Sequence, residues 1–199
     1  EGLGFGWTLE YVDDYLYKFG LGTGSEETGG AFVDLIKINF KTGEYERIKN
    51  DFLLNPRGLT HDGEYFYVND FSLLKMFKFT IEDNQLNIIN SFDIPEKELG
   101  GTAGLTTDKE FLYLRSRDCK KLYKLNKEGD LIDEISLNGC YDKALTWDGQ
   151  YFWMAHGNMI RKLTKEGKLV GQIYQPAKET WGMTWDGNYL WTLQRTAEL

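Results

Sequence analysis

The sequence predicts an all-β protein built from repeated four-stranded antiparallel units, and three observations support this fold class. Aromatic residues make up 15% of the 199 residues, and 22 glycines accompany them. Aromatic side chains favour strands and glycine favours tight turns. Short runs in which apolar and polar residues alternate, the period of a half-buried strand, recur along the chain. Finally, one sequence pattern is repeated, and such a repeat indicates the fold more strongly than any single element does.

The repeated pattern is Gly-Leu-Thr, a variable residue, Asp-Gly and then an aromatic run. Its copies are Gly58–Tyr67, Gly104–Tyr113, Ala144–Trp153, Gly182–Trp191 and a looser copy, Gly6–Tyr17. The looser copy has two extra residues before its aromatic run when it is aligned on its threonine, Thr8. Asp-Gly between apolar runs is typical of a β-hairpin. Each copy therefore predicts the first two strands of a unit, with the alternating aromatic residues of the second strand packed between units.

A second hairpin is predicted after each of the first four copies. Its strands and turns are indicated by the alternating runs Leu35–Asn39, Met76–Thr80, Leu122–Asn126 and Ile160–Thr164, the Gly-containing turns Lys41–Glu44, Lys127–Asp130 and Lys165–Lys168, and the closing runs Leu131–Leu137 and Leu169–Tyr174. Four antiparallel strands in roughly 40 to 45 residues form a β-propeller blade. We therefore expect one domain, residues 1–199, that is a five-bladed β-propeller with blades at approximately 1–50, 51–94, 95–137, 138–175 and, incomplete, 176–199.

The last predicted blade has only its first two strands, and three explanations remain open. The ring is a five-bladed propeller with a slim last blade, or the chain is a fragment of a larger ring. Alternatively, the open edge of residues 177–199 self-associates or pairs with another subunit, because an unpaired strand edge is a template for strand addition.

Charge and hydropathy exclude two classes of partner. The formal net charge is −8, whereas a nucleic-acid binder needs a basic surface. No apolar run approaches the roughly 18 to 20 residues that span a bilayer, so we expect no membrane insertion. The chain begins at Glu1 without a leader, and we expect a processed or excised domain with an extracytoplasmic or cell-surface location.

Catalysis has no support from the motifs. The aspartates of the repeated pattern, Asp62, Asp108, Asp148 and Asp186, are expected to cap their own turns. The two histidines, His61 and His156, stand at non-equivalent positions, and no nucleophilic triad is indicated. We therefore expect no catalytic residue, no metal ligand and no cofactor; a structural cation in the central channel remains open.

Binding has more support. If the strands of a blade are labelled A to D from the axis outward, the D–A and B–C loops share one face of the ring, here called the loop face. The residues predicted to bind there are Arg57, Asn69, Asp70, Arg115, Arg117, Tyr141, Lys143, His156, Trp181 and Arg195. The position just before each A strand varies between blades as Phe5, Arg57, Ala103, Lys143 and Trp181.

Arginine beside aromatic residues is enriched at binding hot spots. We therefore predict a non-enzymatic scaffold that binds a protein, peptide or glycan partner through this face. The alternative is that these are ordinary solvated loop residues.

The two cysteines are predicted to lie close together. Pairing outward from the Glu128–Gly129 turn sets Cys119 opposite Leu137 or Asn138, just before Cys140. Both then lie at one rim of the third blade, where a disulfide is geometrically feasible in an extracytoplasmic protein.

The repeat resembles the blades of bacterial propellers related to plant-type glutaminyl cyclases. The best local match is Glu179–Gly187, which is similar to the Glu-Gly-Trp-Gly-Leu-Thr stretch of that family. The resemblance implies a five-bladed ring and makes a cyclase-like or lactonase-like enzyme the alternative function. However, the family's Phe-Thr-Gln-Gly opening reads Gly4-Phe-Gly-Trp7 here, and Lys18 follows Tyr17 where the family has its glutamate. The catalytic motif of the cyclases is therefore not retained.

Overall fold

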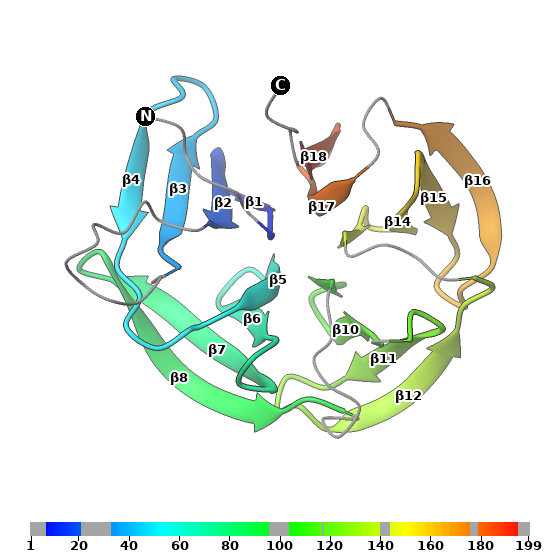
Figure 1. The fold of residues 1–199 in the computed structure, drawn as a ribbon, viewed down its shortest axis with the longest axis horizontal. Helices are drawn as coiled ribbons and strands as arrows, with labels where there is room; N and C mark the ends of the chain where they lie inside the picture. Colours follow the sequence, from blue (N-terminus) through cyan, green and yellow to red (C-terminus); the bar gives the residue numbers. More distant parts are fainter. Residues whose placement is uncertain are drawn as a thin grey trace.

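The computed structural model is an all-β propeller, described here for residues 7–20, 33–95, 104–116, 118–139, 144–175 and 179–194. Within these residues eighteen strands form four four-stranded antiparallel sheets and one two-stranded sheet. The sheets stand around a central axis like blades, with β1, β5 and β17 near the axis and β4, β8, β12 and β16 at the periphery (Figure 1). These described residues contain no helix long and apolar enough to cross a membrane.

The strands follow the predicted order. Blade one has β1 (Glu10–Val12), β2 (Tyr15–Phe19), β3 (Leu35–Asn39) and β4 (Tyr45–Ile48); blade two has β5 (Pro56–His61), β6 (Phe66–Asp70), β7 (Lys75–Glu82) and β8 (Gln85–Asp93); blade three has β9 (Leu105–Thr107), β10 (Leu112–Arg115), β11 (Lys121–Leu125) and β12 (Leu131–Ser136). Blade four has β13 (Leu145–Trp147), β14 (Phe152–His156), β15 (Met159–Leu163) and β16 (Leu169–Tyr174), and the two-stranded sheet is β17 (Thr180–Trp185) with β18 (Leu190–Gln194).

The inner strands contact one another in ring order, from β1 through β5, β9, β13 and β17, and β17 also contacts β1. Side chains reinforce this last junction. The backbone N–H of Tyr11 donates a hydrogen bond to Thr184 Oγ1 at 3.0 Å, and Phe40 packs edge-on against Trp191 with ring centroids 4.8 Å apart. The two-stranded sheet therefore occupies a position in the ring between blades four and one.

The sequence located most strands closely. The runs predicted at Leu35–Asn39 and Leu169–Tyr174 are β3 and β16, and the turn between β3 and β4 places Gly43 at a φ of +74°. Such a positive φ is accessible to glycine without a steric penalty.

One predicted alignment is wrong. The sequence pattern aligns Thr8 with the threonine of the other four copies, but β1 pairs Glu10 with Tyr17. In blade two the equivalent pair is Thr60 with Tyr67, and in the last sheet it is Thr184 with Trp191. Glu10 therefore occupies the position at which the other inner strands carry threonine. Asp13 and Asp14, both at positive φ, form the β1–β2 turn, so with this pairing the first copy has no extra residues before its aromatic run.

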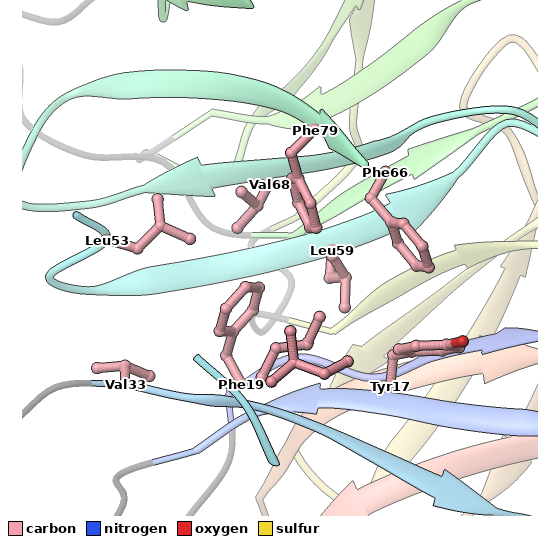
Figure 2. Close-up of a cluster of buried hydrophobic side chains, with 10 residues drawn as sticks. Tyr17, Phe19, Val33, Leu53, Leu59, Phe66, Val68 and Phe79 are labelled. Atoms are coloured by element: carbon pink, nitrogen blue, oxygen red, sulfur yellow. The ribbon is translucent and has the colours of Figure 1, made fainter. Parts of the chain in front are cut away.

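Apolar clusters between neighbouring blades form the core. Between blades one and two, Phe19, Leu59, Val68 and Phe79 are all buried and point toward one another (Figure 2). Further clusters lie between blades two and three, between blades three and four, and between blade four and the two-stranded sheet. Burying such aromatic and aliphatic side chains stabilises the fold by roughly 1.5–3 kcal/mol each.

In the four complete blades, a lysine of the third strand covers an aromatic ring at the start of the second strand or directly before it. The Nζ atoms of Lys37, Lys78, Lys124 and Lys162 lie 3.7–4.3 Å from the ring centroids of Tyr15, Tyr65, Phe111 and Tyr151. Tyr189, directly before β18, is the equivalent residue of the last sheet, where the described residues provide no third strand, and it is 68% exposed. Among the described residues, the two-stranded sheet therefore has no third-strand lysine to cover the ring of Tyr189.

Candidate functional site

The channel has two ends that differ in shape. One end is the loop face; the other, here called the turn face, is formed by the turns between the first and second strand of each blade. Each inner strand runs from the loop face to the turn face, so residues at equivalent positions of the five strands form rings around the axis.

On the loop face, three consecutive blades stack their side chains. The Arg57 guanidinium lies 4.4 Å from the centroid of the Trp7 ring, and Trp7 stacks on Trp181 with centroids 6.0 Å apart and planes 15° apart. On its other side Arg57 lies 5.4 Å from the Phe71 ring. We call Arg57, Trp7 and Trp181 the Arg–Trp stack.

The corrected alignment explains this stack. Arg57 stands three residues before Thr60, and Trp181 stands three residues before Thr184. Trp7 likewise stands three residues before Glu10, which occupies the threonine position in β1. Alignment on Thr8 places Phe5, instead of Trp7, three residues before the repeated threonine. Phe5 lies outside the described residues. Trp7 is therefore a site residue that sequence reasoning missed, although correct alignment of the first copy would have found it.

Several polar atoms beside the stack are unsatisfied. Within the described residues, the buried Nε1 of Trp7, Nε of Arg57 and Oδ1 of Asn55 have no hydrogen-bond partner. Burial lowers the pKa of Arg57 despite the nearby Asp70. A buried polar atom without a partner costs about 1–3 kcal/mol, which a ligand or water recovers by bonding to it.

The channel itself is nearly filled at this end. The space beneath the stack is only about 10 Å³. The glycines of the repeated pattern let the inner strands approach this closely: a Cβ on Gly58 would lie 2.6 Å from the backbone nitrogen of Leu105, and one on Gly182 would lie 2.8 Å from the carbonyl carbon of Thr8. A loop-face ligand therefore lies on the stack rather than inside the channel.

Asp70, another predicted loop-face residue, has a structural role. Asp70 is fully buried and accepts hydrogen bonds from the backbone amides of Leu54, Asn55, Ser72 and Leu73 at 2.7–2.9 Å. It therefore shapes the two loops that carry Asn55 and Phe71.

The remaining predicted residues are spread around the rim. Asn69 is buried on β6, Arg115 is buried and donates to the Ser116 carbonyl at 2.9 Å, and His156 is half-buried at the end of β14. Arg117, Tyr141, Lys143 and Arg195 lie outside the described residues.

Cys119 is disulfide-bonded, and it has a positive φ of 58° at the loop-face end of blade three. The predicted register of the adjoining hairpin is confirmed as far as the pair Lys121 and Ser136. Its predicted partner, Cys140, lies outside the described residues, so that pairing stays a prediction.

The turn face holds a cavity of about 570 Å³. Its floor carries Glu10 and the ring threonines Thr60, Thr106, Thr146 and Thr184. Its walls carry the next residue of each inner strand: Tyr11, His61, Thr107, Trp147 and Trp185.

Glu10 is the chemically distinctive residue of this cavity. Its Oε1 accepts hydrogen bonds from the backbone N–H of His61 at 2.9 Å and the Thr60 hydroxyl at 3.3 Å, and its Oε2 accepts one from the Thr184 hydroxyl at 3.3 Å. Burial raises the pKa of Glu10 to about 8, and these hydrogen bonds only partly oppose the effect. The carboxyl group thus links blade one to both of its neighbours and can gain or lose a proton near neutral pH.

The turn-face aspartates serve the turns, as predicted. Asp62 Oδ1 accepts from the amides of Glu64 and Tyr65 at 2.9 and 2.8 Å, while Oδ2 accepts from the Tyr67 hydroxyl at 3.2 Å. Asp108, Asp148 and Asp186 repeat this arrangement, each bonding the aromatic side chain five residues later. The spacing of Asp and Tyr or Trp in the repeated pattern is therefore a hydrogen-bonding requirement.

No protein-family model and no curated protein sequence matches the chain. Solved structures do match its fold. The chain is similar to a Myxococcus xanthus glutaminyl cyclase, with a TM-score of 0.70 and 13% identity over 96% of this chain and 86% of that chain.

It is also similar to a streptogramin B lyase, with a TM-score of 0.58 and 13% identity over 95% of this chain and 62% of the lyase. A third match is a chain of the nidogen/laminin complex, with a TM-score of 0.56 and 14% identity over 90% and 84% of the two chains. At these identities the matches establish the β-propeller fold, which enzymes and binding proteins share.

Proposed function

We propose that the protein is a non-enzymatic five-bladed propeller, with an incomplete last blade, that binds a protein or peptide partner through its loop face. The observation that carries this proposal is the Arg–Trp stack with its three unsatisfied polar atoms. Arginine and tryptophan are the residues most enriched at interaction hot spots. The occurrence of the same fold in the nidogen/laminin complex supports a partner of this class.

The chemistry of the stack favours a peptide segment over a small molecule. Trp7 Nε1 and Arg57 Nε are donors and Asn55 Oδ1 is an acceptor. They can bond the carbonyl oxygens and amide N–H of a peptide once binding shifts the groups that cover them, because all three atoms are buried in the unbound protein, while the flat rings pack against the side chains of the peptide. The predicted residues Arg117, Tyr141, Lys143 and Arg195 extend this face in the proposal, and a glycan is the alternative ligand.

The test is a screen of peptide and glycan arrays, followed by affinity measurements on the best peptide. We expect Trp181→Ala to weaken binding by about 2 kcal/mol, roughly 30-fold, because it removes one ring of the stack. Trp185→Ala is the matched control: Trp185 is also half-buried on β17 but lines the turn-face cavity. It should bind the peptide as the wild type does.

Arg57→Ala should weaken binding to a similar extent, while Arg47→Ala on the peripheral strand β4 should not. Equal losses in Trp181→Ala and Trp185→Ala would show that binding follows overall stability and would contradict the proposed face. A hit only on the glycan array would assign the face to the alternative ligand.

The similarity to a glutaminyl cyclase keeps a cyclase-like enzyme as the second candidate. Against it, the position where the resemblance expects a glutamate holds Lys18, which is buried and whose pKa burial lowers. Ammonia released from a glutaminyl peptide would contradict the non-enzymatic part of the proposal.

A further inference from the structure

We propose that the turn-face cavity binds a small organic cation with a primary ammonium head, which pairs with the carboxylate of Glu10. This site is at the opposite end of the channel from the Arg–Trp stack, so the inference does not depend on the proposed function.

The cavity has the size and lining of a ligand site. Its volume of about 570 Å³ lies within the roughly 300–1,000 Å³ typical of small-molecule pockets. At its floor, the hydroxyls of Thr60 and Thr184 each lie 3.3 Å from an oxygen of the Glu10 carboxylate. This cluster offers several acceptors to an ammonium group, which has donors only.

The wall residues suit the organic part of such a ligand. Tyr11, Trp147 and Trp185 are equivalent residues of three inner strands and line one cavity. Aromatic rings pack against alkyl groups and attract a cation through their π faces, by about 0.5–2 kcal/mol each.

The charges that face Glu10 favour a cation. The charged or titratable groups that line the cavity with it, besides the Tyr11 phenol, are Asp13, His61, Asp108, Lys109, Asp148 and Asp186. Four of these are carboxylates and one is a lysine. Asp108 is already paired with Lys165 at 2.6 Å, which leaves three carboxylates beside Glu10, and burial lowers the pKa of His61. The cavity therefore attracts cations and disfavours anions.

The donor set fits an organic cation better than a metal ion. The floor contributes one carboxylate, and no group of three or more His, Cys, Asp or Glu side chains placed to hold a metal occurs among the described residues. The cavity is also far larger than one ion requires, since a single water molecule occupies about 30 Å³.

Binding should release a proton. Burial raises the pKa of Glu10 to about 8, so roughly nine-tenths of the protein carries a neutral carboxyl group at pH 7. An ammonium ion stabilises the ionised form, and the proton of Glu10 passes to the buffer as the ion pair forms. Affinity should therefore rise by roughly 50- to 100-fold from pH 6 to pH 8.5.

The experiment is isothermal titration of the protein with n-butylammonium, with n-butanol as the neutral probe of equal size. We expect n-butylammonium to bind and n-butanol to bind at least tenfold more weakly. Repeating the titration at pH 7 in buffers of different ionisation enthalpy should show close to one proton released per ligand.

Two variants locate the site. Glu10→Gln should weaken n-butylammonium binding at least about 30-fold and abolish its pH dependence, because the charge is lost while the shape is kept. Glu10→Thr installs the side chain that the other four inner strands carry, so it should fold and also fail to bind. Glu110→Gln is the matched control: Glu110 is exposed in the β9–β10 turn and its loss should leave binding unchanged.

Three results with n-butylammonium would overturn the inference. These are the absence of n-butylammonium binding, binding without proton release, and unchanged binding in both Glu10 variants. Tight binding of Ca²⁺ or Mg²⁺ that displaces n-butylammonium would also overturn it, by assigning the cavity to a metal ion.

Discussion

At the scale of residues, Glu10 departs from the repeat, which has threonine at this position of the inner strand. Four inner strands carry a threonine at the channel floor, and β1 carries a carboxyl group that bonds to blade two and to the two-stranded sheet. A threonine side chain is too short to reach both neighbours. Glu10 thus links the blades on either side of β1, at the junction where the ring closes.

The raised pKa of Glu10 makes a prediction about stability. Its pKa is about 8 in the folded protein against an ordinary value of 4.5, so between these pH values the folded state binds a proton that the unfolded state has lost. The free energy of unfolding should therefore fall as pH rises through this window, by at most about 1.4 kcal/mol per pH unit.

The measurement is urea unfolding of the wild type and Glu10→Gln from pH 5 to pH 8.5. His61, whose pKa burial lowers below its ordinary value, acts in the opposite direction, and the difference between the two proteins removes its contribution. The wild type should lose stability relative to Glu10→Gln as pH rises. A constant difference would show that Glu10 titrates normally.

Trp7 and Glu10 show why part of the site could not be predicted from the sequence. Both follow from the alignment of the first repeat, in which Thr8 matched the pattern better than Glu10 did. The alignment depends on which residues pair across the β1–β2 turn. The structure shows that Asp13 and Asp14, both at positive φ, form this turn, and that Glu10 pairs with Tyr17. Arg57 and Trp181, in regular copies, could be predicted.

At the scale of elements, the Asp of each first hairpin forms a unit with its turn and its second strand. Asp148 accepts from the amides of Gln150 and Tyr151 at 2.8 and 2.6 Å and from Trp153 Nε1 at 2.7 Å. Because the acceptor is a carboxylate, each bond is stronger than a neutral one. This explains why the pattern could be located from sequence: the same bonds recur in every regular copy.

These bonds make a quantitative prediction. Asp148→Ala removes all three and should lower the free energy of unfolding by about 2–4 kcal/mol, whereas Trp153→Phe removes one and should cost about 1–2 kcal/mol. Asp133→Ala, an exposed carboxylate on β12, should change stability by less than about 0.5 kcal/mol. Urea denaturation of the three variants measures this order, and similar losses in all three would contradict it.

At the scale of the whole molecule, the ring closes between β17 and β1. The contacts are the Trp7–Trp181 stack, the bond from the Tyr11 amide to Thr184, and the packing of Phe40 on Trp191. The sequence predicted the four complete blades and the hairpin that forms β17 and β18, because local periodicity reveals them. It could not predict the closure, because closure depends on contacts between residues more than 150 positions apart.

Closure by these side chains predicts a monomer of 23.1 kDa. Light scattering during size-exclusion chromatography at high protein concentration measures this mass. A doubled mass would instead support self-association through the edge of residues 177–199, where β18 has no third strand among the described residues.

Indole N–H signals in a two-dimensional ¹H–¹⁵N spectrum test the loop-face proposal most directly. The six tryptophans give six signals, and Trp7 and Trp181 report the loop face while Trp147 and Trp185 report the turn face. Titration with the best peptide from the array should shift the signals of Trp7 and Trp181, with the largest change at the unpartnered Trp7 Nε1–H. Shifts confined to Trp147 and Trp185 would contradict the loop face as the binding surface.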